Sequence, residues 1–102
     1  MLGFIKKLFG PGTDYKELVK NGAVIIDVRT PGEFSGGNIK GSVNIPLDSL
    51  GNEKKKLPSK DKVIITCCAS GMRSAAGKSM LKSKGYTAYN GGGYMALQRK
   101  LS

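Results

Sequence analysis

Histidine is absent from the 102-residue chain, and cysteine occurs only at two adjacent positions, Cys67 and Cys68. Without histidine, the chain has no Cys-His pair, no Ser-His-Asp triad and no zinc site with histidine ligands. Neighbouring cysteines rarely form a disulfide with each other, because the ring that they would close is strained. The chain is therefore not a disulfide scaffold, and we expect no metal ion and no cofactor. Any nucleophile must be activated by something other than an imidazole base.

Long hydrophobic runs are also missing. The first ten residues carry apolar side chains, but Lys6 and Lys7 interrupt them, so the stretch is too short and too polar for a membrane span. It also lacks the apolar core and the small-residue cleavage site of a signal peptide. We expect residues 1–12 to form a basic amphipathic extension docked on the domain, with a weak membrane-surface contact as the alternative. The expected location is cytoplasmic, and export after removal of a signal is the alternative.

The composition is that of one globular domain, which we expect over residues 13–102. Hydrophobic residues make up 39% and charged residues 24% of the chain. The formal net charge of +10 favours acidic partners, acidic membranes, nucleic acid or small anions. The lysine run at 54–56 has no interleaved aromatic residue, which predicts a solvated loop rather than a nucleic-acid site. We expect a monomer that does not bind nucleic acid.

Apolar runs alternate with helical patterns along the chain. Residues 23–28 and 63–67 are short, apolar and rich in β-branched side chains, which predicts strands buried on both faces. Shorter strands are predicted over 42–45 and 87–89. Helices or helical turns are predicted over 14–21, 31–34, 47–50, 73–84 and from about residue 94. This alternation predicts a small three-layer α/β fold, with a central parallel sheet of four or five strands covered by helices on both faces.

Ligands in such folds bind beyond the carboxyl ends of the strands, where residues 68–74 run from a strand into a helix. Backbone N–H groups in a turn of this kind can form an anion-binding nest, which the N-terminus of the helix reinforces. A thiol facing the nest has a lowered pKa, because hydrogen bonds hold its thiolate. We expect Cys68 to face the nest and Cys67 to point to the other side of the sheet as a core residue. The alternative is that both cysteines are small core residues.

Four segments resemble the sequence blocks of rhodanese domains, in the same order. They are IIDVRTPGEF at 25–34, GNIKGSVNIPL at 37–47, CASGMRSA at 68–75 and GYTAYNGGGYMAL at 85–97. The resemblance covers about residues 14 to 100 and implies a rhodanese-like fold with sulfurtransferase activity. It implies that Cys68 accepts a sulfur atom as a persulfide. It also implies that the sulfur is cradled by the loop residues Ala69, Ser70, Gly71, Met72 and Arg73.

The implied reaction has two steps. Cys68 takes sulfane sulfur from a small anionic donor such as thiosulfate, and a thiophilic acceptor then removes that sulfur. Cyanide is the acceptor in the test tube, and a thiol such as glutathione or thioredoxin is the acceptor in the cell. Ala69 and Ser70 give a neutral loop, unlike versions with basic residues at these positions. The resemblance therefore implies that thiosulfate is a poor donor.

Asp27, Arg29 and Glu33 are implied to support the loop. Asp27 is expected to pair with the backbone or with an arginine, and Glu33 is expected to occupy a buried pair. Arg73 is expected either to steer an anionic substrate or to brace the loop. Asn38 and Leu97 stand where the family usually has histidine and tryptophan, which changes structure and packing rather than chemistry.

Two other functions remain open. Cell-cycle dual-specificity phosphatases resemble rhodaneses but have a loop one residue longer, and counting from Cys67 to Arg73 gives their spacing. The second alternative is a non-catalytic binding module that uses its basic surface. The S-G-x-R-S match favours the shorter loop that begins at Cys68, and so it disfavours the phosphatase. The presence of the cysteine disfavours a non-catalytic binding module.

Overall fold

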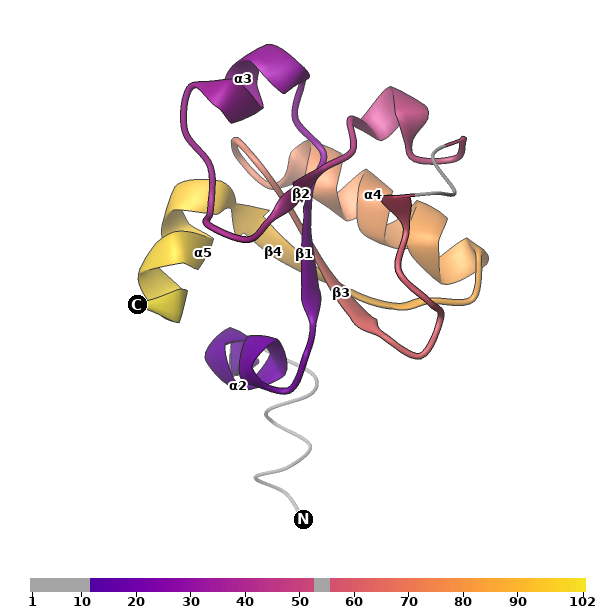
Figure 1. Cartoon of the computed structure of the whole chain (residues 1–102), viewed down its shortest axis with the longest axis horizontal. Coiled ribbons are helices and arrows are strands. Elements are labelled where there is room, and N and C mark those ends of the chain that lie inside the picture. The colour runs from indigo at the N-terminus through magenta and orange to yellow at the C-terminus, as the bar shows by residue number, and fades with distance from the viewer. Residues whose placement is uncertain (1–11, 53–55) are drawn as a thin grey trace.

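A computed structural model describes residues 12–52 and 56–102 as a parallel sheet between two layers of helices (Figure 1). The strands of this four-stranded sheet lie in the order β2-β1-β3-β4, and every neighbouring pair is parallel. Their bounds are β1 Val24–Asp27, β2 Val43–Asn44, β3 Val63–Cys68 and β4 Thr87–Gly93. The predicted α/β fold with a small parallel sheet is confirmed.

Helices cover both faces of the sheet. Their bounds are α2 Tyr15–Lys20, α3 Pro31–Ser35, the 3-10 helix η1 Leu47–Ser49, α4 Met72–Ser83 and α5 Tyr94–Leu101. Helix α4 packs on one face, whereas α2 and α5 lie together on the other (Figure 1). Helix α3 stands beyond the carboxyl end of β1, beside the site described below.

The alternation of side chains along each buried strand divides the core into two clusters. Ile26 and Ile64 pack with Leu81 of α4, whereas Ile25 and Ile65 face the α2 and α5 side. The period of two along a strand sends neighbouring residues to opposite faces, so a continuous apolar run serves both layers. Each isoleucine fully buried in this way stabilises the fold by about 1.5–3 kcal/mol relative to exposure.

The clearest difference from the sequence-based boundaries is the length of β4. The strand was expected over 87–89, but it continues to Gly93, which pairs with Cys68 across a register shift in β3. A Cβ on Gly91 would lie 2.8 Å from Ile65 Cγ2 and 2.9 Å from Leu97 Cδ2. Only a glycine lets the backbone approach so closely. The glycine run therefore extends the sheet to the edge at which β3 ends.

The first eleven residues of the expected N-terminal extension lie outside the described residues, as do Lys54 and Lys55 of the lysine run. Among the helices that are described, none combines the length and the hydropathy needed to cross a bilayer. Asp14 caps the N-terminus of α2, because its Oδ1 atom accepts from the Glu17 amide at 3.0 Å.

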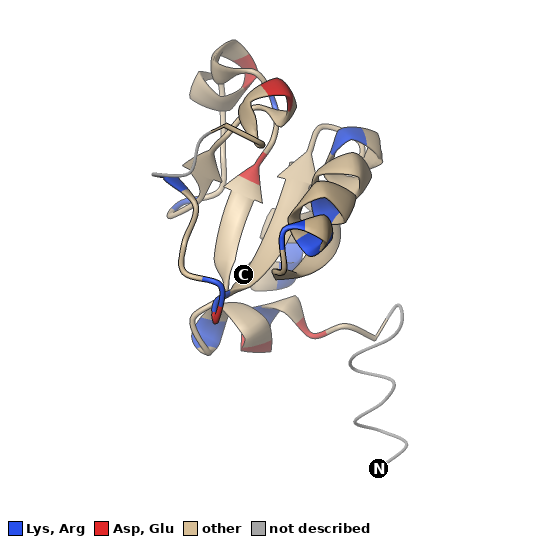
Figure 2. Cartoon of the chain, turned by 90° about the vertical axis from the view of Figure 1, so that its right-hand side faces the viewer, with Lys and Arg blue, Asp and Glu red and all other residues tan. Residues whose placement is uncertain are grey.

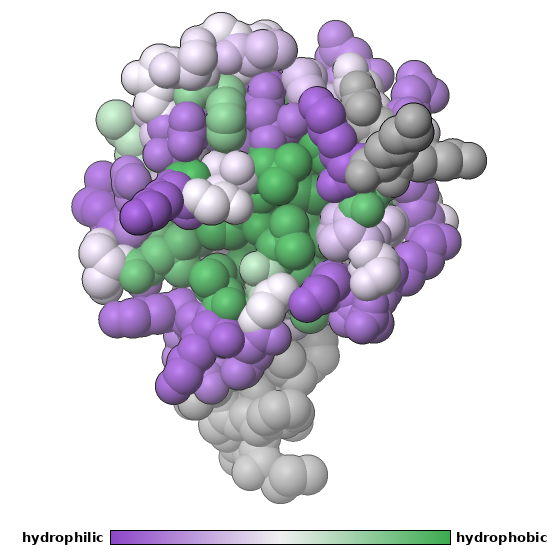
Figure 3. Space-filling model, viewed as in Figure 1, coloured by the Kyte–Doolittle hydropathy of each residue, from purple (hydrophilic) through white to green (hydrophobic). Residues whose placement is uncertain are grey.

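Charge and hydropathy are distributed differently over the surface. Lys and Arg positions are spread along helices and loops, whereas the few Asp and Glu positions are scattered singly (Figure 2). On the face seen in Figure 3, hydrophobic residues gather over the middle of the molecule inside a hydrophilic rim. Among the described residues, Lys and Arg positions are therefore not confined to one helix or one loop (Figure 2).

Candidate active site

Cys68 lies at the carboxyl edge of the sheet, where β3 turns into α4. It is the last residue of β3, and α4 begins at Met72, one residue earlier than predicted. Gly71 makes the turn with a φ of 105°, in the left-handed region that side chains disfavour. The turn brings the Gly71 amide and the Ser74 amide of the first turn of α4 to the cysteine sulfur.

Polar groups from two positions of this turn contact the sulfur. The Gly71 amide lies 2.9 Å and the Ser74 amide 3.3 Å from Cys68 Sγ. The Ser74 hydroxyl also lies 3.3 Å from the sulfur. Donors at the start of a helix have no partner within the helix, so they are available to an anion.

These contacts offset the effect of burial on the thiol. Burial raises the pKa of Cys68, but the Ser74 hydroxyl and the amides of Ser74, Gly71 and Ser70 together lower it below the usual value. Hydrogen bonds to a thiolate stabilise the charged form, so these donors favour ionisation of the Cys68 thiol without a neighbouring base.

Cys67 has the opposite environment. Its side chain belongs to the hydrophobic cluster on the α2 and α5 side, whereas Cys68 belongs to the cluster on the α4 side. Burial, and then the nearby Asp27 carboxylate, raise the pKa of Cys67 to about 12. Both side chains are fully covered, so their surroundings and not their exposure distinguish them. The prediction that the two cysteines face opposite sides is confirmed.

Sequence reasoning missed Ser74. The expected cradle comprised residues 69–73, but its amide bonds to the sulfur come from Gly71 and Ser74. Met72 is 82% exposed. The signal for Ser74 was its place in the first turn of the helix, where both the amide and the hydroxyl turn back toward the preceding strand.

Asp27 and Arg29 form a buried pair at the end of β1, as expected for Asp27. The Arg29 Nη2 atom lies 2.7 Å from Asp27 Oδ2, and Arg29 Nε lies 2.9 Å from Asp27 Oδ1. The guanidinium also donates to the carbonyls of Glu33 and Gly37, and it stacks 3.8 Å from the centroid of the Tyr94 ring. Every charged atom therefore has partners, and the pair ties β1 to the α3 region and to α5.

Arg73 braces the loop through Glu33 of α3. Its Nη1 and Nη2 atoms lie 2.8 Å and 2.9 Å from the two carboxylate oxygens of Glu33. The Arg73 guanidinium, and then the Thr30 amide, lower the pKa of Glu33 to about 2. The expectation that Glu33 is buried was wrong: its side chain is 37% exposed, because Glu33 also closes the surface capping box of α3 with Thr30.

Asn90 of β4 completes the site and was also missed by the sequence reasoning. Its Oδ1 atom accepts from the Gly92 amide at 2.9 Å and contacts Ser74 Oγ at 2.6 Å. Its Nδ2 atom donates to the Gly71 carbonyl at 3.2 Å. Asn90 lies 16 residues beyond Ser74, and the sequence holds no local pattern that joins them.

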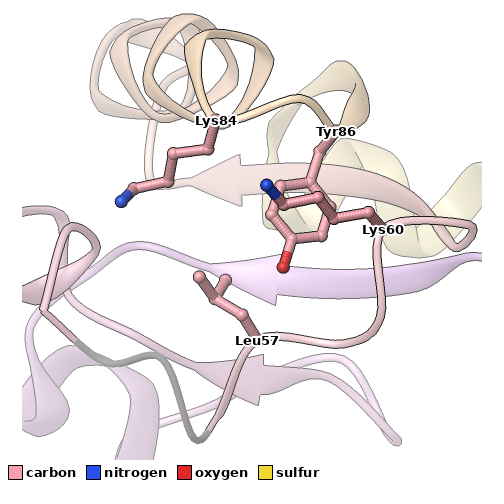
Figure 4. Close-up of a pocket in the computed structure, with 4 residues that line it drawn as sticks. All are labelled: Leu57, Lys60, Lys84 and Tyr86. Carbon is pink, nitrogen blue, oxygen red and sulfur yellow. The ribbon is translucent and has the colours of Figure 1, made fainter.

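Other possible sites are poorer candidates. Throughout the described part of the chain, His, Cys, Asp and Glu side chains form no group of three that could hold a metal ion. A pocket of about 450 Å³ is lined by Leu57, Lys60, Lys84 and Tyr86 (Figure 4). These residues precede β3 and β4, so the pocket lies at the amino ends of the strands, opposite Cys68. Among the described residues, the Cys68 loop is therefore the better candidate for a reactive site.

Comparison with known proteins agrees with this geometry. Residues 12–100 match the family model of the rhodanese-like domain. The uncharacterized protein YqhL of Bacillus subtilis is 40% identical over 65 residues, which are 64% of this chain and 51% of YqhL. The thiosulfate sulfurtransferase PspE of Escherichia coli is 33% identical over 63 residues, 61% of each chain.

The fold match extends to solved structures. The chain superposes on a human single-domain sulfurtransferase with a TM-score of 0.68 and 26% identity, covering 86% of this chain and 92% of that one. The chain thus spans only 51% of YqhL and 61% of PspE, but nearly the whole of this human structure. Its sequence blocks, its parallel sheet and the cysteine at the end of β3 place it in one family: the chain is a member of the rhodanese-like domains.

Proposed function

We propose that the chain is a sulfurtransferase that carries sulfane sulfur as a persulfide on Cys68. The observation that carries the proposal is the contact of two amides and one hydroxyl with Cys68 Sγ, which lowers the pKa of this thiol although the chain has no histidine. Relatives named as sulfurtransferases support the same class of reaction.

The first step loads the sulfur. The Cys68 thiolate attacks the outer sulfur of thiosulfate, the S–S bond of the donor breaks, and sulfite leaves with the bonding electron pair. Cys68 then carries a persulfide whose terminal sulfur bears the negative charge. The helix N-terminus and the loop amides stabilise that charge, as they stabilise the thiolate.

The second step returns the enzyme to its starting state. Cyanide attacks the terminal sulfur, the new S–S bond breaks, and thiocyanate leaves while Cys68 regains its thiolate. A cellular thiol such as glutathione or thioredoxin takes the same part and becomes a persulfide. The proposal takes the chain to act as a monomer in the cytoplasm.

Thiosulfate is expected to load slowly. Arg73 and Arg29 are both engaged by carboxylates, so neither guanidinium offers a free charge to an incoming dianion. The loop side chains Ala69 and Ser70 are neutral. The Cys68 side chain is also fully covered, so a donor reaches the sulfur only after a neighbouring group moves.

The position of Cys67 disfavours the hypothesis that the chain is a phosphatase. A loop with phosphatase spacing would use Cys67 as the nucleophile, but that thiol lies on the far face of the sheet with a pKa of about 12. A thiol this weakly acidic is almost entirely protonated near neutral pH, so it is a poor nucleophile.

Intact mass measurement tests the proposal. The wild-type protein is incubated with thiosulfate and is expected to gain one sulfur atom, which cyanide then removes as thiocyanate. Cys68→Ser is expected to gain nothing, and Cys67→Ser is expected to gain sulfur normally. Uptake that survives in Cys68→Ser but disappears in Cys67→Ser would contradict the proposal, as would hydrolysis of an aryl phosphate without sulfur uptake.

A further inference from the structure

The hydroxyl of Ser74 lies between two groups that compete for its single proton. It is 3.3 Å from Cys68 Sγ and 2.6 Å from Asn90 Oδ1, and the Ser74 side chain is fully buried. A serine hydroxyl has one proton and two lone pairs, so it donates to only one of these neighbours at a time. The direction in which this proton points decides whether the hydroxyl stabilises a thiolate or accepts from a thiol.

Two backbone groups fix the orientation of the Asn90 side-chain amide. The Gly92 amide can only donate, and it lies 2.9 Å from Oδ1. The Gly71 carbonyl can only accept, and it lies 3.2 Å from Nδ2. Asn90 therefore presents an acceptor to Ser74, and the hydroxyl donates to it when nothing stronger competes.

From this arrangement we propose that Asn90 is a positioning residue that holds the Ser74 proton away from Cys68 while the sulfur is neutral and releases it when the sulfur is charged. With a neutral thiol, the S–H donates to Ser74 Oγ and the Ser74 O–H donates to Asn90. With a thiolate, the O–H turns to the sulfur, and Asn90 Oδ1 keeps the Gly92 amide as its donor. This rotation of the Ser74 hydroxyl leaves no buried polar atom without a hydrogen-bond partner, so its free-energy cost is small.

The inference rests on the proposed function for its meaning in catalysis. During loading, the Cys68 sulfur loses its negative charge as it forms the S–S bond, and the Ser74 O–H turns back to Asn90. During unloading, the electron pair of that bond returns to Cys68 Sγ, and the O–H turns to it again. The proton stays on Ser74 throughout, so only a hydrogen bond moves. The site thus stabilises the Cys68 charge at the two moments when Cys68 is attacking or leaving.

Few other charges act on this sulfur. Ionisable neighbours among the described residues are Cys67 on the same strand, the Asp27–Arg29 pair at the end of β1 and the Arg73–Glu33 pair between α4 and α3. Each of the two pairs is neutral as a whole. From β4, the group that faces the Cys68 loop is the uncharged Asn90 amide, which leaves the Ser74 hydroxyl as the adjustable donor.

The test measures how the rate of Cys68 alkylation and the ultraviolet absorbance of the thiolate depend on pH. Ser74→Ala is expected to lower the thiolate fraction near neutral pH about tenfold, because one charge-assisted hydrogen bond is lost. Asn90→Ala is expected to raise that fraction about two- to threefold, because the Ser74 proton no longer has a competing acceptor. In the Ser74→Ala background, Asn90→Ala is expected to change nothing.

Other variants keep the test decisive. Asn90→Asp adds a negative charge and holds the Ser74 proton more strongly, so it is expected to lower the thiolate fraction. Ser79→Ala on the exposed part of α4 and Asn52→Ala in an exposed turn are matched controls, expected to behave as wild type. Unfolding curves for every variant show that the fold is intact.

Two results would overturn the inference. One is additivity of the Ser74→Ala and Asn90→Ala effects. The other is a lowered thiolate fraction in Asn90→Ala in both backgrounds, since Asn90 would then act by anchoring Gly71. The Gly71 carbonyl also accepts from the Ala75 amide at 3.1 Å, so the loop keeps an anchor without Asn90. Alkylation needs no sulfur donor, so its result can be interpreted even if sulfur loading fails. A failure of sulfur loading would contradict the proposed function and not this inference.

Discussion

Two adjacent thiols of the same strand differ in acidity because the sheet sends them to different surroundings. Cys68 meets donors from the loop and α4, whereas Cys67 meets the hydrophobic cluster and the Asp27 carboxylate. The alternation along a strand could be predicted from the sequence, and it sufficed to tell the two apart. The role of Asn90 could not be predicted, because Asn90 reaches Ser74 only through the packing of β4 against α4.

The same contrast predicts selective alkylation. Iodoacetamide is expected to modify Cys68 with a pH midpoint below the usual value of a thiol, because hydrogen bonds hold its thiolate. Cys67 is expected to stay unmodified until the pH approaches 12 or the protein unfolds. Mass spectrometry of the matched variants Cys68→Ala and Cys67→Ala measures each thiol alone. Modification of Cys68→Ala near neutral pH, in folded protein, would refute the assignment.

The Arg73–Glu33 pair predicts how stability changes in acid. The pKa of Glu33 falls from 4.5 to about 2 in the folded protein, so the carboxylate contributes stability above pH 4.5 that is lost as the pH falls toward 2. Glu33→Gln is therefore expected to unfold at a lower temperature than wild type near pH 6, with a difference that shrinks between about pH 4.5 and pH 2. Thermal unfolding at several pH values measures this difference.

Glu17→Gln supplies the control for the loss of one carboxylate. Glu17 is exposed on α2, away from the Arg73 loop. A difference for Glu33→Gln that stays constant down to pH 2, or that Glu17→Gln reproduces, would mean that Arg73 does not hold Glu33 in solution.

At the scale of elements, the glycine run of β4 decides how the site is assembled. The positions of the strands and helices could be predicted from apolar periodicity and caps, but the end of β4 could not. Apolar periodicity is a pattern of side chains, so it gives no signal for a strand segment made of glycines. Gly93 shows the consequence, because a Cβ there would lie 2.8 Å from the Ala69 carbonyl oxygen of the Cys68 loop. The extension of β4 to Gly93 therefore sets how closely the strand supports that loop.

Gly91 offers the direct test of this packing. Gly91→Ala is expected to destabilise the fold by about 1–3 kcal/mol, since its methyl group would meet Ile65, Leu97 and the Thr66 carbonyl at 2.8–2.9 Å. Urea unfolding measures the change. The matched variant is Gly32→Ala in α3, where no neighbouring atom lies within 4 Å of the added Cβ. It is expected to be neutral or to stabilise the fold by about 0.5–1 kcal/mol. Equal effects at the two positions would contradict the close approach of β4.

For the whole molecule, the net charge of +10 acts on a site whose own charged groups are paired. Arginines at the site cannot attract an anion strongly, because carboxylates already hold them. Lys and Arg positions elsewhere are spread over the surface, and their fields add at distances comparable with the Debye length of about 10 Å at 0.1 M salt (Figure 2). The long-range field therefore attracts an approaching anion more than the two paired arginines do.

Iodoacetate and iodoacetamide separate this field from the chemistry, because they alkylate the same thiolate and differ in charge. At Cys68, the rate with iodoacetate divided by the rate with iodoacetamide is expected to fall with added salt. The fall is on the order of two- to fivefold from low salt to about 0.2 M, since screening removes the attraction for the anion only. Free cysteine, treated in parallel, corrects for the effect of salt on the reagents. If the corrected ratio stays constant or rises, the thiolate's own charge outweighs the field of the surface, and the basic surface does not concentrate anionic donors at the site.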